Sequence, residues 1–217
     1  MAVGQHGRDC VQQRWGLDCM VGIAVRQRWG LDNMVGTSIG KHEGAVLPEG
    51  QQRQRALNIK LVLTDSDGVL TDSGVYYSAS GEELRRFSVR DGMGAERLRA
   101  AGIETAIMTG ENCPAVRKRA EKLKMRYLYM GVRDKLAHLP VVYSQTGLGL
   151  SQIAYIGDDI NDMDVINTIN PQGLTAAPAD AIPQVQQAVH YLSASRGGEG
   201  AFRDFAEWIL RLRGLQN

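Results

Sequence analysis

From Leu57 onward, short apolar runs alternate with stretches of helical periodicity, and this rhythm constrains the possible folds more than any other feature of the chain. The expected strands span residues 61–64, 105–108, 127–130, 153–156 and 174–176. Continuous apolar runs of this kind are typical of parallel strands that are covered on both faces. The expected helices span residues 95–101, 114–124, 135–145, 162–168 and 201–212. Strands that alternate with helices predict a doubly wound α/β domain around a parallel sheet.

One insertion interrupts this alternation directly after the first strand. Residues 75–79 and 84–89 have strand character, and the pair Ser80-Gly81 between them is a turn signal. This pattern predicts a β-hairpin. Because the hairpin is too small to be an independent domain, we expect an α/β domain without a large cap.

Residues 1–56 differ in character from the rest of the chain. A ten-residue segment that begins at Gln13 recurs at Gln27 with nine identical positions. Two copies are too few to close a solenoid core, and termini that are not tied down are usually disordered. We therefore expect a poorly ordered extension over residues 1–56, which ends in a polar linker at residues 50–55, followed by one domain at 57–217. The alternative is a docking peptide that presents the tryptophans of the repeat.

Composition excludes several classes of protein. The chain has 25 Lys and Arg against 24 Asp and Glu, a balance that argues against an electrostatic nucleic-acid binder. No apolar run approaches the roughly 18 residues of a transmembrane helix, so no membrane partner is expected. The three cysteines are few and odd in number, which suits a reducing compartment. A cytoplasmic location is expected.

Acidic residues follow two of the expected strands at the point where each strand ends. Asp65 and Asp67 come directly after the first strand, and Asp158, Asp159 and Asp162 follow the fourth. Ligands of a doubly wound sheet bind beyond the carboxyl ends of its strands, where these acids would meet. Carboxylates are costly to hold together unless a cation or a shared proton compensates, and hard oxygen ligands suit Mg²⁺. We therefore expect a magnesium site at this edge of the sheet.

Six motifs occur in a specific order: DSDGVLTD at 65–72, FSVRDGMG at 87–94, TGE at 109–111, Lys135, YIGDD at 155–159 and RGGEGA at 196–201. On these motifs, residues 58–213 resemble the haloacid dehalogenase-like phosphohydrolases, and within them the capless sugar-acid phosphatases. That subfamily includes 3-deoxy-D-manno-octulosonate 8-phosphate phosphatase and the phosphatases of nine-carbon keto-acid 9-phosphates. The C-terminal domain of animal acylneuraminate cytidylyltransferases is a relative.

The resemblance implies a mechanism. Asp65 would attack phosphorus and form an aspartyl-phosphate, while Asp67 would protonate the leaving alkoxide and later deprotonate water. Mg²⁺ would be held by Asp65, the backbone carbonyl of Asp67, and Asp158. Thr109 and Lys135 would bind the phosphoryl oxygens.

The resemblance also implies a substrate-binding set, made of Asp67, Ser88, Val89, Arg90, Asp91, Gly92 and Lys135. Arg90 could instead be structural and pair with an acid such as Asp91. Asp159 would orient Lys135 or a metal-bound water. Asp162 is either a supporting acid of the site or only a helix-start residue.

Residues after the second strand bear on the choice of substrate. The octulosonate phosphatases usually have Arg where this chain has Glu111, and a Glu cannot bind a substrate carboxylate as an Arg would. A TGE motif followed eleven residues later by Lys122 resembles the nine-carbon 9-phosphate phosphatases instead, and the same helix offers Arg119. The alternative for Lys122 and Arg119 is a solvated helix face.

Two function classes remain open on the resemblance. One is a Mg²⁺-dependent phosphatase of a keto-sugar acid phosphate, in sialic acid or lipopolysaccharide biosynthesis. The other is a non-catalytic oligomerisation or regulatory module, like the cytidylyltransferase-linked relatives. Retention of Asp65, Asp67, Lys135 and Asp158 favours the enzyme.

The hairpin bears on assembly. It carries Val75, Tyr77, Leu84 and Phe87, which is more apolar surface than a solvated ribbon needs. Capless relatives are tetramers whose hairpins join and whose subunits wall each other's sites, so we expect a homotetramer with a shared active site. The alternative is a hairpin that folds onto its own domain.

Overall fold

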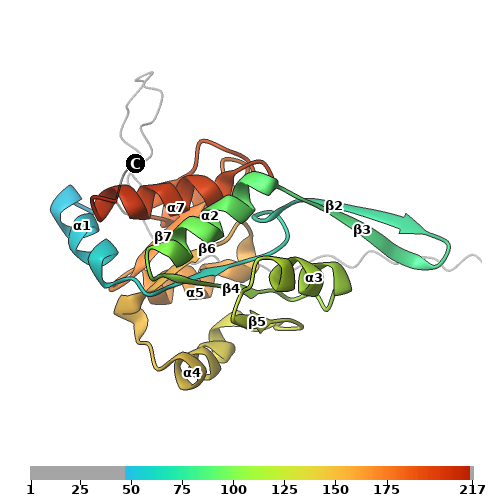
Figure 1. Ribbon diagram of the computed structural model, residues 1–217, viewed down its shortest axis with the longest axis horizontal. Helices are drawn as coiled ribbons and strands as arrows, with labels where there is room; N and C mark the ends of the chain where they lie inside the picture. Colours follow the sequence, from blue (N-terminus) through green and yellow to red (C-terminus); the bar gives the residue numbers. More distant parts are fainter. Residues whose placement is uncertain (1–46, 216–217) are drawn as a thin grey trace, which may run out of the picture. The chain divides into compact units, whose positions relative to one another are not determined.

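The computed structural model describes residues 47–215, which form a three-layered α/β domain (Figure 1). The tandem repeat of the N-terminal extension lies outside these residues. Within them, six strands form one sheet in the order β5-β4-β1-β6-β7-β8, and every neighbouring pair is parallel. The strands are β1 (Leu61–Thr64), β4 (Glu104–Met108), β5 (Tyr127–Tyr129), β6 (Ile153–Ile156), β7 (Leu174–Ala177) and β8 (Tyr191–Leu192). The predicted fold class is confirmed.

Helices cover both faces of this sheet. They are α1 (Glu49–Asn58), α2 (Val89–Ala100), α3 (Pro114–Lys122), α4 (Lys135–Thr146), α5 (Met163–Ile169), α6 (Pro183–Ala188) and α7 (Ala201–Leu212). Buried side chains of α1, α2, α3 and α7 join one core, and those of α4, α5 and α6 join the other. Successive residues of a strand point to opposite faces, so Val62 enters the first core while Leu61 and Leu63 enter the second.

Helix α2 starts earlier than its periodicity predicted. We expected strand character through residue 89 and a helix from residue 95. Instead the Ser88 side chain accepts a hydrogen bond from the Arg90 N–H at 3.1 Å, which caps the helix and starts it at Val89. Helix α6 and strand β8 were not predicted, because six and two residues are too short to show a period.

The polar segment at residues 50–55 is helix α1, so the prediction of a linker there is wrong. Ala56 is fully buried in the first core, and the helix packs beside α7. Arg55 donates to the backbone carbonyls of Asn170, Pro171 and Gly173 at 2.6–2.9 Å, beyond the end of α5. The predicted domain boundary at residue 57 falls inside this helix.

The expected β-hairpin is present as a separate two-stranded antiparallel sheet. Strands β2 (Thr71–Ser78) and β3 (Gly81–Phe87) project from the domain beyond α2 and α3 (Figure 1). Three of its apolar side chains, Tyr76, Tyr77 and Leu84, are between 63% and 73% exposed. Phe87 at its base instead packs against the first core. No larger insertion lies between β1 and β4, so the described domain has no cap of that kind.

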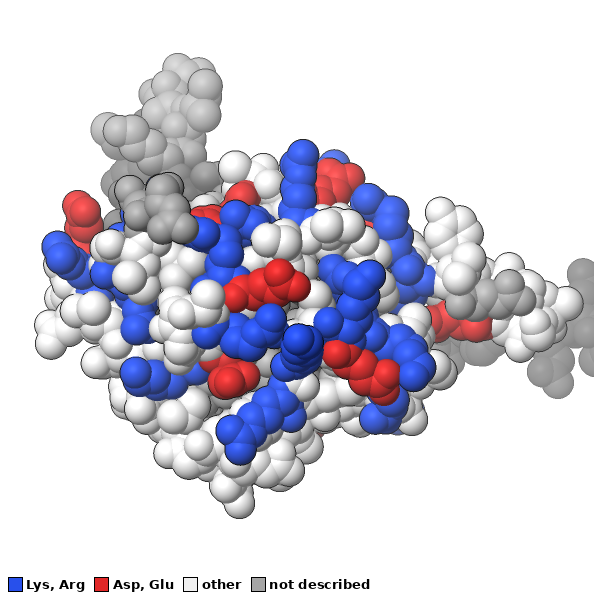
Figure 2. Space-filling view, in the orientation of Figure 1, with Lys and Arg blue, Asp and Glu red and all other residues white. Residues whose placement is uncertain are grey.

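Charged side chains of both signs share the face formed by α2 and α7. Figure 2 shows that basic groups on this face are interspersed with acidic ones. Arg97 and Arg203 both pair with Glu207, at 2.5 and 2.7 Å. Among the described residues, no helix is long and apolar enough to cross a membrane.

Candidate active site

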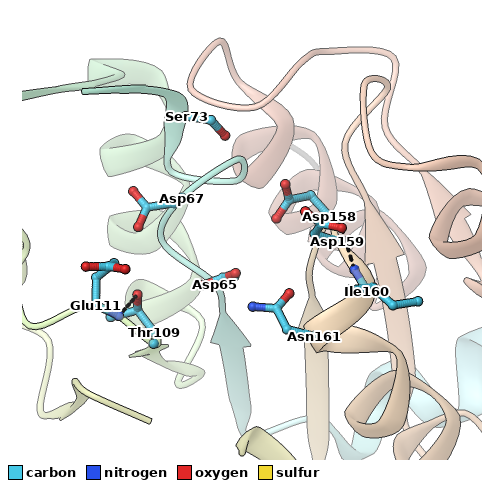
Figure 3. Close-up of a pocket in the computed structure, with 10 residues that line it drawn as sticks. Asp65, Asp67, Ser73, Thr109, Glu111, Asp158, Asp159, Ile160 and Asn161 are labelled. Atoms are coloured by element: carbon cyan, nitrogen blue, oxygen red, sulfur yellow. Dashed lines mark hydrogen bonds between the residues drawn. The ribbon is translucent and has the colours of Figure 1, made fainter. Parts of the chain in front are cut away.

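The carboxyl ends of β1, β4 and β6 open onto a cavity of about 250 Å³ (Figure 3). Parallel strands end at one edge of the sheet, so topology brings together residues almost a hundred positions apart. The lining residues are Asp65, Asp67, Ser73, Thr109, Gly110, Glu111, Asp158, Asp159, Ile160 and Asn161. The structure therefore unites the acids predicted at the ends of the first and fourth strands.

Asp65 lies directly beyond β1, on the floor of this cavity. Its N–H donates to the carbonyl of Ile156 at 3.0 Å, and its side chain is 7% exposed. The Ser66 N–H donates to Oδ1 at 2.6 Å, and Lys135 Nζ lies 2.7 Å from Oδ2. Burial, and then the charge of Asp162, raise the pKa of Asp65 to about 7, against the opposing effect of Lys135.

Lys135 reaches the same point from the first turn of α4, and its ammonium is fully buried. It lies between two carboxylates, 2.7 Å from Asp65 and 2.5 Å from Asp162. Burial lowers the pKa of Lys135, but the two carboxylates outweigh it and the net pKa is raised. An ammonium in this position can bind both the nucleophile and an oxygen of a transferred phosphoryl group.

Asp162, and not Asp159, holds Lys135. Its Oδ1 also accepts from the hydroxyl of the fully buried Tyr155 at 2.5 Å, and its Oδ2 accepts from the N–H groups of Asp158 and Asp159. Asp159 is exposed, and its carboxylate accepts from its own neighbour's N–H instead. Of the two roles predicted for Asp159, the orientation of Lys135 is therefore wrong, and the orientation of a metal-bound water stays a prediction. Tyr155 was not predicted as a site residue, because a tyrosine within a buried strand ordinarily indicates a core position.

Three carboxylates lie close together at the sheet edge, and two of them fit a divalent cation. Oxygens of Asp65, Asp158 and Asp162 all lie within 4.8 Å of one another. Asp162 is already saturated by its four donors, whereas Asp158 Oδ1 is buried without a hydrogen-bond partner. Burial, then Asp65 and Asp162, raise the pKa of Asp158 to about 8. A hard cation between Asp65 and Asp158 would offset this repulsion.

Gly68 is required for this approach of carboxylates. Its φ is +84°, and a Cβ at this position would overlap the carboxylate of Asp158. Glycine therefore serves twice here, in a left-handed turn and in a close contact between the loops after β1 and β6.

Thr109 and Glu111 form the wall at the end of β4. Thr109 is buried, and its hydroxyl accepts from the Glu111 N–H at 3.2 Å. The Glu111 side chain is exposed and borders the cavity on the same side as Asp67 (Figure 3). Both predicted positions therefore reach the site.

Asp67 stands at the mouth of the cavity with its side chain 28% exposed. Its Oδ1 pairs with Arg85 of strand β3 and accepts from the Thr71 hydroxyl at 3.2 Å. Arg85 was not predicted as a site residue. A charged residue in an exposed hairpin ordinarily indicates a solvated position, so the sequence carried no signal for it.

The predicted substrate-binding set at residues 88–92 does not line the cavity. Asp91 is buried, accepts from the Arg203 N–H at 3.0 Å, and makes no pair with the exposed Arg90. Burial raises the pKa of Asp91 to about 6. The idea of an Arg90–Asp91 pair is therefore wrong, and Asp91 instead joins α2 to the start of α7.

Helix α3 supplies no further residue to the cavity within one chain. Arg119 donates to the carbonyl of Ser88 at 2.6 Å and lies over the ring of Phe87. Lys122 is exposed at the end of the helix. Arg119 thus packs two elements together and is not the solvated residue of the alternative interpretation.

Comparisons with known proteins agree with this geometry. The chain is 38% identical over 162 residues to 3-deoxy-D-manno-octulosonate 8-phosphate phosphatase of Haemophilus influenzae, spanning 75% of this chain and 88% of that protein. It is 40% identical over 157 residues to the phosphatase of the same name from Yersinia pestis, spanning 72% and 82%. No protein-family model matches the chain.

Solved structures give the same picture. A cobalt-bound deoxy-D-mannose-octulosonate 8-phosphate phosphatase from Haemophilus influenzae matches with a TM-score of 0.70 at 38% identity, covering 74% of this chain and 92% of that one. The enzyme from Moraxella catarrhalis, in complex with magnesium, phosphate and KDO, matches with a TM-score of 0.71 at 33% identity, covering 76% and 93%. A putative hydrolase of the HAD superfamily from Legionella pneumophila matches at 36% identity and a TM-score of 0.71, covering 76% and 89%.

Proposed function

This chain belongs to the 3-deoxy-D-manno-octulosonate 8-phosphate phosphatase family of haloacid dehalogenase-like hydrolases, and from that premise we propose a Mg²⁺-dependent phosphatase of a keto-sugar acid phosphate. The observation that carries the proposal is the buried contact of Lys135 with Asp65, beside the unpartnered oxygen of Asp158. A candidate nucleophile and a candidate metal ligand thus line one cavity, and the buried ammonium of Lys135 lies directly behind the nucleophile. We also propose a cytoplasmic location, supported by the free thiol of Cys113.

In the proposed mechanism an oxygen of Asp65 attacks phosphorus, a bond forms between them, and the bond from phosphorus to the sugar oxygen breaks. Asp67 gives its proton to that departing oxygen and later takes one from the water that hydrolyses the aspartyl-phosphate. Lys135 and the Thr109 hydroxyl bind phosphoryl oxygens. The cation would be held by Asp65, Asp158 and the Asp67 carbonyl, and when bound it offsets the charge of the phosphate.

The test of this mechanism is metal removal. Chelation of the purified protein should abolish hydrolysis of sugar-acid phosphates, and added Mg²⁺ should restore it. Asp158→Asn should raise the Mg²⁺ concentration needed for half-maximal activity about tenfold or more, because it removes a metal-ligand charge. Full activity after exhaustive chelation would overturn the metal-dependent mechanism.

For the substrate we propose a nine-carbon 9-phosphate ahead of octulosonate 8-phosphate. The named relatives act on the eight-carbon compound, but Glu111 borders the cavity where the octulosonate phosphatases usually carry Arg. A carboxylate repels the substrate's own carboxylate and accepts hydrogen bonds from hydroxyl or amide groups of a longer sugar. Lys122 does not border the cavity within one chain, so Glu111 alone supports this assignment.

The substrate assignment is tested by kcat/KM for the two compounds. The nine-carbon 9-phosphate should give the higher value, and Glu111→Arg should shift the ratio toward the eight-carbon compound. Glu121→Arg is the matched control, because it makes the same charge change on the exposed face of α3. Equal or reversed ratios in the wild-type protein would refute the nine-carbon preference while leaving the phosphatase activity intact.

We further propose a homotetramer with a shared active site. In one chain the cavity is open, and residues 88–92 lie off its wall, so the sugar end of a substrate has few partners. Tyr76, Tyr77 and Leu84 are large apolar side chains that the hairpin exposes, which supports contact with other copies. Neighbouring subunits would then cover the cavity and exclude water from the phosphoenzyme.

A further inference from the structure

A buried arginine connects the hairpin to the candidate acid–base residue. The Arg85 side chain is only 3% exposed, although strand β3 lies in a projecting hairpin. Its Nε and one Nη bind both oxygens of Glu82, at 2.7 and 3.2 Å, and its other Nη forms an ion pair with Asp67 Oδ1. The hydrogen bond to Glu82, more than any other contact, raises the pKa of Arg85 above its ordinary value.

An irregularity in the hairpin makes this contact possible. Tyr77 pairs with Glu82 and Tyr76 with Leu84, so two residues of β2 face three of β3. The extra residue interrupts the alternation, and it places Glu82 and Arg85 on the same face although they are three positions apart. The guanidinium can then bind Glu82 with one edge and reach Asp67 with its remaining nitrogen.

The arginine is also tied to the loop after β4. Glu82 accepts a hydrogen bond from Cys113 Sγ at 3.1 Å, and Cys113 is the residue that precedes helix α3. The connection therefore runs from the loop after β4, through Glu82 and Arg85, to Asp67 after β1. The side chains of Glu82, Arg85 and Asp67 thus connect three separate elements around the cavity.

Both contacts of Asp67 fall on the same oxygen. Arg85 and the Thr71 hydroxyl bind Oδ1, which leaves Oδ2 without either contact on a residue that lines the cavity. We propose that Arg85 is a positioning residue, which fixes the Asp67 carboxylate so that Oδ2 faces the leaving oxygen of the substrate. This inference rests on the acid–base role of Asp67 in the proposed function. Arg85 keeps its own protons, and the transferred proton passes between Asp67 Oδ2 and the sugar oxygen.

A comparison of leaving groups tests the proposal. A sugar alkoxide must be protonated as it leaves, whereas p-nitrophenolate leaves without a proton. Arg85→Gln should therefore lower kcat/KM for a sugar-acid phosphate about 10- to 100-fold, part of the contribution of general acid catalysis. The value for p-nitrophenyl phosphate should change little, because kcat/KM reports the first phosphoryl transfer.

Arg86→Gln is the matched control. Arg86 is the next residue of β3 and also pairs with an aspartate, Asp72 at 2.6 Å, but its side chain is 50% exposed and off the cavity. This variant should leave kcat/KM for both substrates within about threefold of wild type, as expected for an exposed ion pair. Arg85→Lys should recover part of the loss, because it keeps the charge without the two-pronged geometry.

A double-mutant cycle separates the proposal from the function on which it rests. Asp67→Asn should lower kcat/KM for the sugar-acid phosphate, and adding Arg85→Gln to it should cause no further loss. A wild-type value in Asp67→Asn would refute the acid–base role itself. Three results would overturn the positioning role alone. In the double variant, the two losses in kcat/KM could multiply. In Arg85→Gln, kcat/KM could fall equally for both substrates or stay at the wild-type value. If Arg85→Gln does not fold by circular dichroism, Arg85→Lys and Glu82→Gln carry the same leaving-group comparison.

Discussion

At the scale of single residues, the chemistry depends on how a buried charge is compensated. An ammonium that leaves water at Lys135 is costly unless it is paired and hydrogen-bonded. Asp65 and Asp162 supply the pairing, and Tyr155 with two backbone N–H groups satisfies the rest of Asp162. The nucleophile is thus positioned through Lys135 by Asp162 and Tyr155, two residues that need not contact the substrate.

Asp65→Asn should abolish turnover without unfolding the protein. An amide cannot form the acyl phosphate, so we expect kcat to fall by about 10⁴-fold or more, beyond the loss of any single acid–base group. The measurement is steady-state hydrolysis by a purified variant with a wild-type circular dichroism spectrum. Turnover near the wild-type rate would show that another group is the nucleophile.

Tyr155→Phe should weaken the positioning of Asp162, the carboxylate that pairs with Lys135. It removes the 2.5 Å hydrogen bond to Asp162, and we expect a loss of about 1–3 kcal/mol in unfolding free energy, together with a lower kcat. Tyr129→Phe is the control, because its hydroxyl is buried without a partner and its removal should be neutral or stabilising. Urea unfolding of both variants decides the matter, and equal effects would mean that the hydroxyl of Tyr155 does not support the site.

At the scale of elements, helix α1 connects to the end of helix α5 through Arg55. Arg55 binds three carbonyls of the segment 170–173 after α5, and α5 in turn leads back to the loop that carries Asp162. Helix ends leave carbonyls without partners, and a cation there satisfies them and interacts favourably with the helix dipole.

Arg55→Ala should therefore destabilise the domain by about 1–3 kcal/mol, the usual effect of removing charged hydrogen bonds. Arg53→Ala, which removes an exposed arginine from the same helix, should have little effect. Thermal or urea unfolding of the full chain measures both. If the two variants lose the same stability, the helix is held by its apolar contact alone.

A pH effect is expected where β7 meets the loop before β8. His190 Nδ1 accepts from the Thr175 N–H at 3.1 Å, and burial, with Arg55 adding to it, lowers the pKa of His190 from 6.5 to about 4. Between these values the unfolded chain binds a proton that the folded protein does not, so this residue makes stability rise with pH from about 4 to about 6.5.

His190→Asn keeps an acceptor for Thr175 and removes the titration. The stability advantage of the wild type over the variant should accordingly be smaller at pH 4.5 than at pH 7, with both proteins compared by urea unfolding. An advantage that stays constant, or grows as the pH falls, would contradict the assignment. Both proteins contain the same carboxylates, so the effect of their titration on stability cancels in this comparison.

At the scale of the whole molecule, the hairpin connects assembly to the site. It exposes Tyr76, Tyr77 and Leu84, and Arg85, the residue after Leu84, pairs with Asp67. A contact that holds these exposed side chains would also limit motion of Arg85, since all four belong to one short two-stranded sheet, which is marginally stable by itself.

Replacing Tyr76, Tyr77 and Leu84 by Ser should dissociate the proposed tetramer and lower kcat/KM for sugar-acid phosphates. Sedimentation of the full chain gives the assembly state, and the same samples give the activity. Leu57→Ser is the control, because this leucine of α1 is also half exposed but lies away from the hairpin. A fully active monomer at assay concentration would rule out a shared active site.

Within residues 47–215, the sequence alone determined five of the six strands of the main sheet, five of the seven helices that cover it and the edge at which the acids gather. These features follow from local periodicity and from the rule that parallel strands end at one edge. Asp65, Asp67 and Asp158 could thus be assigned to one site before any coordinates, because the end of a buried strand is visible in the residues themselves. The prediction of a linker at residues 50–55 was wrong because these residues show no apolar periodicity. The one buried residue of helix α1, Ala56, lies just beyond them.

Tertiary structure decided which neighbour each charge would bind. Asp159 and Asp162 lie in one acidic turn, and nothing local distinguishes the one that meets Lys135 from the one that faces solvent. Arg85 can bind Glu82 as well as Asp67 because an extra residue in β3 breaks the strand alternation between Glu82 and Leu84. Pairing of charges depends on distance and burial in three dimensions, and a pattern along the chain carries neither quantity.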